Sequence, residues 1–351
     1  MASFINSKQS ITLGPVYKVY YRIMFHPHFL LNLLLFTLLL PAHARRQPLS
    51  PMWLQQGDSI AVISPSCPPE AEQIEPGMEI LRQWGFRPGM GPNALKNYHS
   101  YAGTIDQRRS DLLQALCNPQ VKAVICTRGG QGLAQLLYEI PLDTLRRYPK
   151  WVVGFSDITA LLSAEVQAGI QSIHANMVEG IGRYPEQDSV NEVLHQLLLG
   201  HLPSYHQAPH PYNVYGKGQG MLVGGNMSVL GALADTPYDM LRQKDIILFI
   251  EDTGEGMYSV DRMFHQLMLR GVLKRVRGLI IGRFTDYKPD LGYASMEEML
   301  HKVIERYAPD FDYPICFGFP AGHGSHRPNV PLLMGHCVTL SVSAQGTDLT
   351  F

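Results

Sequence analysis

The sequence predicts an α/β protein whose strands are parallel and buried on both faces. From Gly57 onward, short apolar runs bounded by Gly, Pro or Ser alternate with stretches of helical period. The runs are apolar throughout rather than at every second residue, which is typical of parallel strands covered by helices on both sides. At 351 residues, the chain is long enough for one large domain or two medium ones.

The first block of the chain, from Gly57 to Gly169, alternates strand and helix without interruption. The expected strands lie in SIAVISPS (59–66), VKAVICTRGG (121–130) and WVVGFSD (151–157). The expected helices lie over 70–84, over 105–118 and in ITALLSAEVQAG (158–169). This alternation indicates β-α-β units and hence a parallel sheet.

A second α/β block follows a stretch in which the pattern weakens. Between Gly169 and Gln219 the chain is rich in His, Pro and Tyr, which we interpret as a connection. The strands expected beyond it lie in GMLVGGN, DIILFIEDTG, VRGLIIGRF and CVTLSVSA, with a helix over 259–270. The predicted organisation is an extension with a signal peptide (1–44), an N-terminal α/β domain (50–170), the connection (171–218) and a C-terminal domain (219–351).

The first residues are typical of an export signal. The apolar run FLLNLLLFTLLL (29–40) is shorter than the roughly 20 residues of a membrane-spanning helix, and the AHA tripeptide ending at Ala44 fits a signal-peptidase site. We expect cleavage after Ala44 and a periplasmic location. The alternative is an uncleaved anchor, with Lys18 and Arg22 on the cytoplasmic side. Met24 is an alternative start that would give a shorter signal peptide.

The net charge disfavours one class of function, and the cysteine content leaves the disulfide pattern open. A net charge of −1 without a long basic run offers no electrostatic footprint for a nucleic acid. The five cysteines are scattered without CxxC spacing. Their odd number leaves at least one thiol free, and their pairing is open.

The first candidate for chemistry is Ser156, in the stretch GFSD (154–157). A serine between a buried strand and a helix lies where α/β folds expose reactive groups, and the helix N-terminus favours a developing oxyanion. Gly154 would permit the tight turn, and Asp157 would contribute chiefly its backbone N–H. The alternative, which this stretch taken alone favours, is that Ser156 or Asp157 merely caps the helix.

A glycine-rich loop, CTRGGQG (126–132), follows another expected strand. Gly129, Gly130 and Gly132 would let backbone N–H groups approach a ligand closely, as half of an oxyanion hole requires. A phosphate cradle is one alternative, although the Lys-Ser/Thr of a P-loop is missing. A tight strand-to-helix turn is the other.

The second block supplies an acid and an imidazole. ILFIED (247–252) ends a strand on Glu251 and Asp252, and GFPAGHGSH places His323 in a glycine-rich loop; each side chain could simply face solvent. His323 and His326 lack a third ligand nearby, so no metal site is expected. With Ser156, these residues supply a nucleophile, a base and a group that orients the base. Chemistry alone does not choose between the two acids.

Seven motifs in order resemble the LD-carboxypeptidases of murein recycling, a family that includes the microcin-immunity peptidases. The resemblance covers nearly all of residues 57–335, and the motifs read GDSIAVISPS, YAGTIDQRRSDLLQAL, RGGQG, GFSDITALL, GGNMSVLGAL, LFIEDTGE and GFPAGHG. The resemblance implies an α/β fold with an N-terminal flavodoxin-like parallel-sheet domain and a C-terminal β-rich α/β domain. The site would be assembled at the interface of these two domains.

The resemblance also implies roles for individual residues of a serine peptidase. By position in the motifs, Ser156 would be the nucleophile, His323 the general base and Glu251 the group that orients it. The backbone N–H groups of Gly130 and Asp157 would form the oxyanion hole, with Gly129 as the alternative to Gly130. No metal ion or organic cofactor is implied.

The implied reaction is hydrolysis of the amide between an L-centre, that of diaminopimelate, and the C-terminal D-Ala of a murein tetrapeptide. Family members with this activity work on fragments in the cytosol, so the export signal leaves the natural substrate open. A microcin-immunity peptidase, which cleaves acyl-sulfamoyl nucleotide conjugates, is the alternative enzyme. A non-catalytic periplasmic ligand-binding protein is the alternative from another class. A homodimer is compatible with the sequence.

Overall fold

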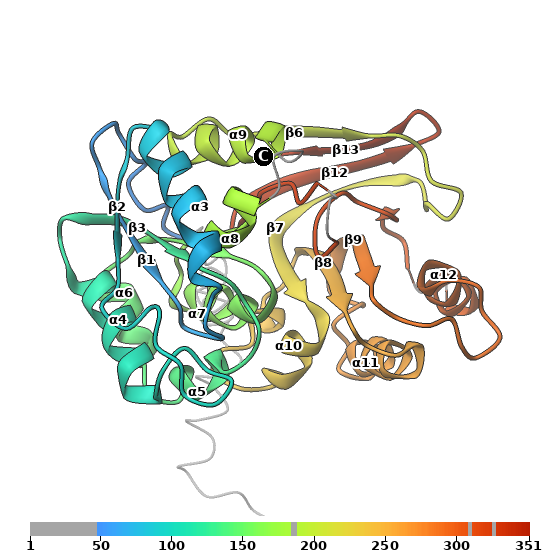
Figure 1. The fold of residues 1–351 in the computed structure, drawn as a ribbon. Helices are drawn as coiled ribbons and strands as arrows, with labels where there is room; N and C mark the ends of the chain where they lie inside the picture. Colours follow the sequence, from blue (N-terminus) through green and yellow to red (C-terminus); the bar gives the residue numbers. More distant parts are fainter. Residues whose placement is uncertain (1–47, 184–187, 308–310, 325–327) are drawn as a thin grey trace, which may run out of the picture. The chain divides into compact units, whose positions relative to one another are not determined.

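The computed structural model describes residues 48–183, 188–307, 311–324 and 328–351. These residues belong to one compact unit that contains two sheets, with the first block on the left of Figure 1 and the second block on the right. The predicted signal segment lies outside the described residues. Among the helices that are described, none is long and apolar enough to cross a membrane.

The first sheet confirms the predicted flavodoxin-like arrangement. Its parallel strands are ordered β2-β1-β3-β4-β5, which is the flavodoxin order, and β11 is added antiparallel beside β5. The strands are β1 (Ser59–Ile63), β2 (Arg87–Met90), β3 (Val121–Cys126), β4 (Trp151–Gly154), β5 (Ser172–His174) and β11 (Leu332–Met334). The carboxyl ends of β1, β3 and β4 therefore meet at one edge of the sheet.

Helices pack on both faces of this sheet and bury a core on each. One core includes side chains of α3 (Ala71–Gln83), α8 (Val178–Arg183) and α9 (Asp188–Leu198). The other includes side chains of α4 (Ile105–Cys117), α5 (Leu133–Leu137), α6 (Leu142–Arg147) and α7 (Thr159–Ala168). Of these, α4 begins at a capping box in which the side chains of Thr104 and Gln107 bond each other's backbone N–H.

Helix α7 is buried nearly all round because it lies between the two sheets. It packs against β4 and β5 of the first sheet and contacts β7 (Gly216–Asn226) of the second. Every residue of α7 except Gln167 is buried, so the segment shows no polar face in the sequence. The turn from β4 into α7 therefore places Ser156 where the two halves of the molecule meet.

The second sheet is half parallel and half antiparallel, which confirms the β-rich α/β class. Its order is β10-β9-β8-β7-β12-β13-β6; β7 to β10 are parallel, and the pairs from β7 through β12 and β13 to β6 are antiparallel. Besides β7, the strands are β6 (Ser204–Gln207), β8 (Ile246–Thr253), β9 (Val276–Thr285), β10 (Ile315–Cys316), β12 (Cys337–Ser343) and β13 (Gly346–Thr350). The accompanying helices are α10 (Met227–Ala232), α11 (Met257–Leu269) and α12 (Met296–Tyr307), with the 3-10 turn η3 (Met240–Arg242). Another 3-10 turn, η1 (Ser156–Ile158), lies between β4 and α7 of the first block.

The segment predicted as a connection, 171–218, contributes to both sheets. It contains β5, α8 and α9, followed by β6, which pairs with β13 at the edge of the second sheet. Strand β11, from the C-terminal part of the chain, returns to pair with β5 in the first sheet. The chain thus crosses between the sheets more than once, and the limits of the predicted domains stay a prediction. All five cysteines are free thiols.

Candidate active site

Ser156 lies just beyond the carboxyl end of β4, on a strained turn. Its φ is +64°, in the left-handed region that residues other than glycine rarely adopt. We predicted that Gly154 permits this turn, but Gly154 does not have a positive φ. It is needed for a different reason: a Cβ at Gly154 would lie 2.8 Å from Cγ2 of Ile158. The strain is thus carried by the serine itself, while the glycine lets the next turn pack closely.

Asp157 does more than supply a backbone N–H. Its Oδ2 accepts hydrogen bonds from Oγ of Ser66 at 2.6 Å and from the backbone N of Leu133 at 3.0 Å. Neither Ser156 nor Asp157 caps α7 with its side chain, so the capping interpretation is wrong for that helix. The Asp157 carboxylate instead ties the Ser156 turn to the loop after β1 and to the start of α5.

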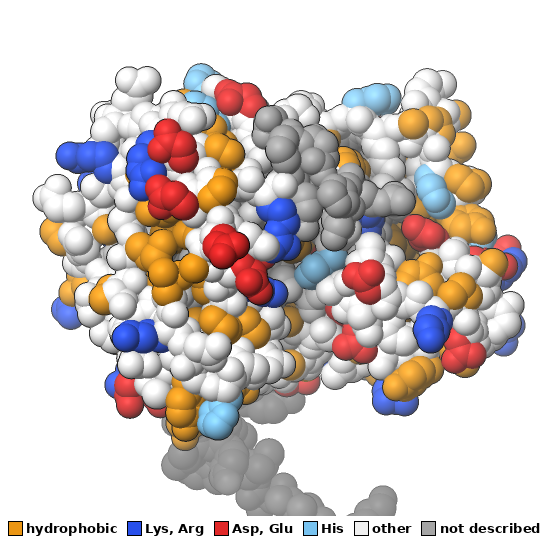
Figure 2. Space-filling model, in the orientation of Figure 1, with side chains coloured by type: hydrophobic (Ala, Val, Ile, Leu, Met, Phe, Trp, Pro, Cys, Tyr) orange, Lys and Arg blue, Asp and Glu red, His pale blue; other side chains and the backbone are white. Residues whose placement is uncertain are grey.

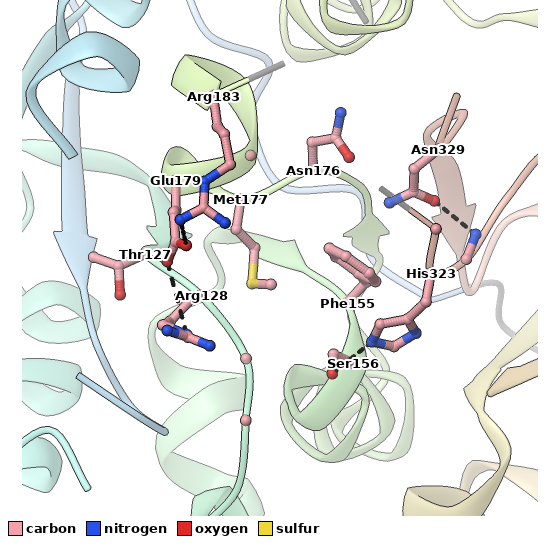
Figure 3. Close-up of a pocket in the computed structure, with 15 residues that line it drawn as sticks. Thr127, Arg128, Phe155, Ser156, Asn176, Met177, Glu179, Arg183, His323 and Asn329 are labelled. Carbon is pink, nitrogen blue, oxygen red and sulfur yellow. Dashed lines mark hydrogen bonds and ion pairs between the residues drawn. The ribbon is translucent and has the colours of Figure 1, made fainter. Parts of the chain in front are cut away.

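Ser156, His323 and Glu251 form a continuous chain of hydrogen bonds. His323 Nε2 lies 2.9 Å from Ser156 Oγ, and His323 Nδ1 lies 2.6 Å from Glu251 Oε2. The backbone N of His323 donates to the same carboxylate oxygen at 3.0 Å. Figure 3 shows the imidazole and the hydroxyl directed toward each other. The three residues predicted from the motifs are therefore brought together from β4, β8 and the loop after β10.

The two neighbouring acids of β8 have different partners because successive residues of a strand point to opposite faces. Glu251 is fully buried and faces His323. Asp252 accepts hydrogen bonds from the side chain of Asn226 and the backbone N of Ser228, both at 2.8 Å. Asp252 thereby holds the start of α10, and only Glu251 is placed to orient the imidazole.

The loop that carries His323 is held by its backbone. Gly322 has a φ of +102°, and a Cβ there would lie 2.7 Å from Cβ of Glu251, so only glycine fits. Arg283 of β9 donates to the carbonyls of Gly322 at 2.7 Å and His323 at 2.8 Å. Asn329 Oδ1 accepts from the N–H of Gly322 at 2.8 Å.

The charges of the buried pair stabilise each other. Burial alone would raise the pKa of Glu251, but His323 outweighs burial and holds the pKa of this carboxyl below its usual value. Burial would lower the pKa of His323, yet the Glu251 carboxylate holds the pKa of the imidazole above its usual value. The imidazole is thus a stronger base than an isolated histidine. Behind it, burial lowers the pKa of His174 to about 4, so that ring is neutral.

The glycine-rich loop after β3 lies directly against Ser156. A Cβ at Gly129 would be 2.8 Å from Cβ of Ser156. Gly130 has a φ of +116°, and a Cβ there would be 2.3 Å from Sγ of Cys67, so both positions require glycine. The loop is braced by Arg108 of α4, whose Nη1 donates to the carbonyls of Pro65 at 2.8 Å and Gly132 at 3.0 Å.

These elements surround a pocket of about 220 Å³. Figure 2 shows the surface hollowed in the middle of this face, where basic, acidic and histidine side chains come together. In Figure 3, Ser156, His323 and Phe155 lie on one side of the pocket, and Arg128, Glu179 and Arg183 lie on the other. The arrangement offers a hydrogen-bonded hydroxyl, a base and a positively charged wall within one small cavity.

Sequence reasoning missed the residues of that wall and those that brace the loops. Arg128 stood within the quoted motif RGGQG, but only its glycines were assigned a function. Arg108 likewise lies within a quoted motif, on the buried face of α4. Glu179 and Arg183 belong to the segment in which the periodic pattern weakened, so no signal in the sequence marked them.

Comparison with known proteins gives concordant results. Two family models match the chain, the LD-carboxypeptidase N-terminal domain over residues 60–175 and the LD-carboxypeptidase C-terminal domain over residues 219–340. The murein tetrapeptide carboxypeptidase of Pseudomonas aeruginosa is 30% identical over 287 residues, which cover 78% of this chain and 91% of that protein.

Comparison with solved structures finds proteins of the same kind. The crystal structure of a muramoyltetrapeptide carboxypeptidase from Oxalobacter formigenes has a TM-score of 0.74 and 27% identity, and covers 83% of this chain and 97% of its own. An MccF-like protein from Bacillus anthracis has a TM-score of 0.75 and 26% identity, and covers 86% of this chain and 99% of its own. MccF itself is a microcin C7 self-immunity protein.

Proposed function

Since this chain belongs to the LD-carboxypeptidase family, we propose that it hydrolyses the amide between the L-centre of diaminopimelate and the C-terminal D-Ala of a murein tetrapeptide. The observation that carries the proposal is the hydrogen-bonded chain from Ser156 through His323 to Glu251. Relatives named for murein peptides support the substrate class. The chemistry of each step follows from the groups in the pocket.

In the first step, His323 Nε2 takes the proton of Ser156 Oγ as the oxygen attacks the scissile carbonyl carbon. The ionised Glu251 holds the ring through Nδ1–H and stabilises its charged form. The imidazolium then gives its proton to the amine of the leaving D-Ala, and an ester with Ser156 remains. Water, activated by the same imidazole, hydrolyses that ester. No step uses a metal ion or an organic cofactor.

The oxyanion would be held by the backbone N–H groups of Gly130 and Asp157. The carbonyl of Gly129 accepts a hydrogen bond from the N–H of Cys67 at 3.3 Å. In a trans peptide the N–H points opposite to the carbonyl, so the N–H of Gly130 is directed away from Cys67. Gly129 and Gly130 both line the pocket with Ser156, so the direction of the Gly130 N–H is what supports its assignment over Gly129.

The test is release of free D-Ala from L-Ala-D-Glu-diaminopimelate-D-Ala by residues 45–351. We expect release by the unaltered chain and by Ser343→Ala, a control at the end of β12. We expect none by Ser156→Ala. A folded, unaltered chain that releases no D-Ala would refute the substrate. Turnover that survives in Ser156→Ala would refute the nucleophile.

A microcin-immunity peptidase is the second candidate, because the likeness to an MccF-like protein is as close as that to the muramoyltetrapeptide carboxypeptidase. The same Ser156 would then attack the acyl group of an acyl-sulfamoyl nucleoside. Offering the unaltered chain equal concentrations of such a conjugate and of the tetrapeptide separates the two. We expect kcat/KM to be higher for the tetrapeptide. A purely ligand-binding protein would turn over neither compound.

We also propose that the protein is exported and acts on murein peptides outside the inner membrane. The support is the apolar run 29–40 and the AHA tripeptide ending at Ala44. Expression of the full chain in a bacterial host, followed by fractionation and N-terminal sequencing, provides the test. We expect a periplasmic protein that begins at Arg45. An intact N-terminus in the membrane fraction would indicate an anchor, and an intact soluble cytoplasmic protein would refute export.

A further inference from the structure

We propose that Arg128 is the receptor for the terminal carboxylate of the substrate and makes the enzyme a carboxypeptidase rather than an endopeptidase. The inference rests on the proposed function. It concerns the side of the pocket that faces Ser156 and His323, formed by Arg128, Glu179 and Arg183 (Figure 3).

The position of Arg128 matches the length of one terminal residue. Arg128 directly precedes Gly129, which lies against Ser156: a Cβ at Gly129 would be 2.9 Å from the serine Oγ. In the substrate, the terminal carboxylate carbon is three bonds beyond the scissile carbonyl carbon. The group that binds this carboxylate must therefore lie about the length of one residue away from the Ser156 hydroxyl. An arginine side chain spans such a distance.

The backbone at Arg128 is held in place on both sides. The carbonyl of Thr127 accepts a hydrogen bond from the backbone N of Glu179 at 3.1 Å, which ties the strand end to α8. On the other side, the carbonyl of Gly129 accepts the hydrogen bond from Cys67. A guanidinium carried on so constrained a backbone is suited to bind one group at a fixed distance from Ser156.

The charges on this wall leave one guanidinium available. Glu179, with a side chain only 10% exposed, lies 2.8 Å from Nη2 of Arg183 but 3.7 Å from Nε of Arg128. Arg128 and Arg183 carry two positive charges and Glu179 carries one negative charge, so this side of the pocket has a net positive charge. The Arg128 side chain is 39% exposed, and its Nη1 and Nη2 donate no hydrogen bond to any side chain or carbonyl of the described residues.

An incoming carboxylate fits this arrangement. Two parallel N–H groups of a guanidinium bind a carboxylate in bidentate fashion, and such bonds are stronger than those between neutral groups. Glu179 would keep the Arg128 side chain oriented through Nε while leaving its outer edge for the ligand. A peptide that continues beyond D-Ala, or ends in an amide, offers no negative charge there.

The test compares the tetrapeptide with the same peptide ending in D-Ala carboxamide. For the unaltered enzyme we expect kcat/KM to be about 10²-fold higher for the free acid. Arg128→Ala should lower kcat/KM for the free acid by about 10²-fold and change that for the amide by less than about threefold. Arg128→Lys keeps the positive charge but lacks the two parallel N–H groups. Its kcat/KM for the free acid should therefore lie between those of the unaltered enzyme and Arg128→Ala. Arg87→Ala, at an exposed arginine of β2, is the matched control.

The outcomes separate this inference from the proposed function. An equal loss on both peptides in Arg128→Ala, with an unchanged melting temperature, would overturn the receptor while leaving the carboxypeptidase in place. So would an unaltered enzyme that cleaves acid and amide equally well. An unaltered enzyme that cleaves neither peptide would overturn the proposed function and this inference together. Loss of discrimination in Arg128→Ala that is smaller in Arg128→Lys and absent in Arg87→Ala would support the receptor.

Discussion

The ends of β4 and β8 each present a reactive side chain to the same pocket, but they hold it by different means. At β4, Ser156 is held by a strained backbone with φ of +64°. At β8, Glu251 lies within the strand, beside a register shift in its pairing with β9, and is held by burial and by its two bonds to His323. A hydroxyl must be exposed on a sharp turn to reach a substrate, whereas a carboxylate must be buried to act strongly on an imidazole.

The largest expected effect tests the β4 side. Ser156→Ala and Ser156→Gly should each lower kcat by up to about 10⁶-fold, because both remove the nucleophile. Their stabilities should differ: glycine adopts the positive φ freely, so Ser156→Gly should be more stable than Ser156→Ala by about 1 kcal/mol. Urea unfolding of both variants measures this difference. Equal midpoints would show that the turn stores no strain.

The next largest effect tests the β8 side. Glu251→Gln should lower kcat/KM by about 10³- to 10⁴-fold, because the amide no longer stabilises the imidazolium. The base acts in its neutral form, so kcat/KM of the unaltered enzyme should rise with pH through a pKa above 6.5. Without the carboxylate, the acid limb of the profile should move to lower pH.

Asp252→Asn is the matched control for that variant. Asp252 bonds Asn226 and Ser228 and acts on His323 only through its charge, so this change should destabilise the fold and move the acid limb much less than Glu251→Gln does. Burial raises the pKa of Asp252 to about 6. A shift of the acid limb in Asp252→Asn as large as that in Glu251→Gln would contradict the assignment of Glu251.

The smallest effect on activity is expected from a change in the loop that carries His323, which joins the β4 and β8 sides of the site. Gly322→Ala places a Cβ 2.7 Å from Glu251 Cβ at a φ of +102°, and should cost about 2 to 4 kcal/mol of stability and displace His323. Gly254→Ala also has a positive φ, of +75°, but nothing lies within 4 Å of its Cβ. It should therefore cost only about 1 kcal/mol and leave kcat unchanged. Equal costs would mean that contact with Glu251 is unimportant.

Much of the fold could be predicted because its strands are short apolar runs between clear turn residues. The strands at 59–63, 121–126 and 151–154 lie where the apolar runs predicted them, and the flavodoxin-like order implied by the resemblance is confirmed. The segment 171–218 was harder, since β5 and β6 are three and four residues long. Elements this short carry too few residues for a periodic pattern to be recognised.

The candidate site was predicted unevenly. Ser156, Glu251 and His323 were chosen from motifs, and they lie within hydrogen-bonding distance in the structure; their catalytic roles stay predictions. That Gly154 permits the turn was predicted but its reason was not, because a sequence shows that a glycine is present but not whether a positive φ or a close neighbour requires it. The side chain of Asp157 was missed because its partners, Ser66 and Leu133, are distant in the sequence.

By itself, the sequence determined the class of fold, the order of its strands along the chain and the residues able to do chemistry, because these depend on local pattern and residue type. Only the tertiary structure decided which acid of β8 faces the imidazole and that Arg128 faces Ser156 across one pocket. These facts depend on which way a side chain points and on what lies across from it. Packing between segments far apart in the chain sets both.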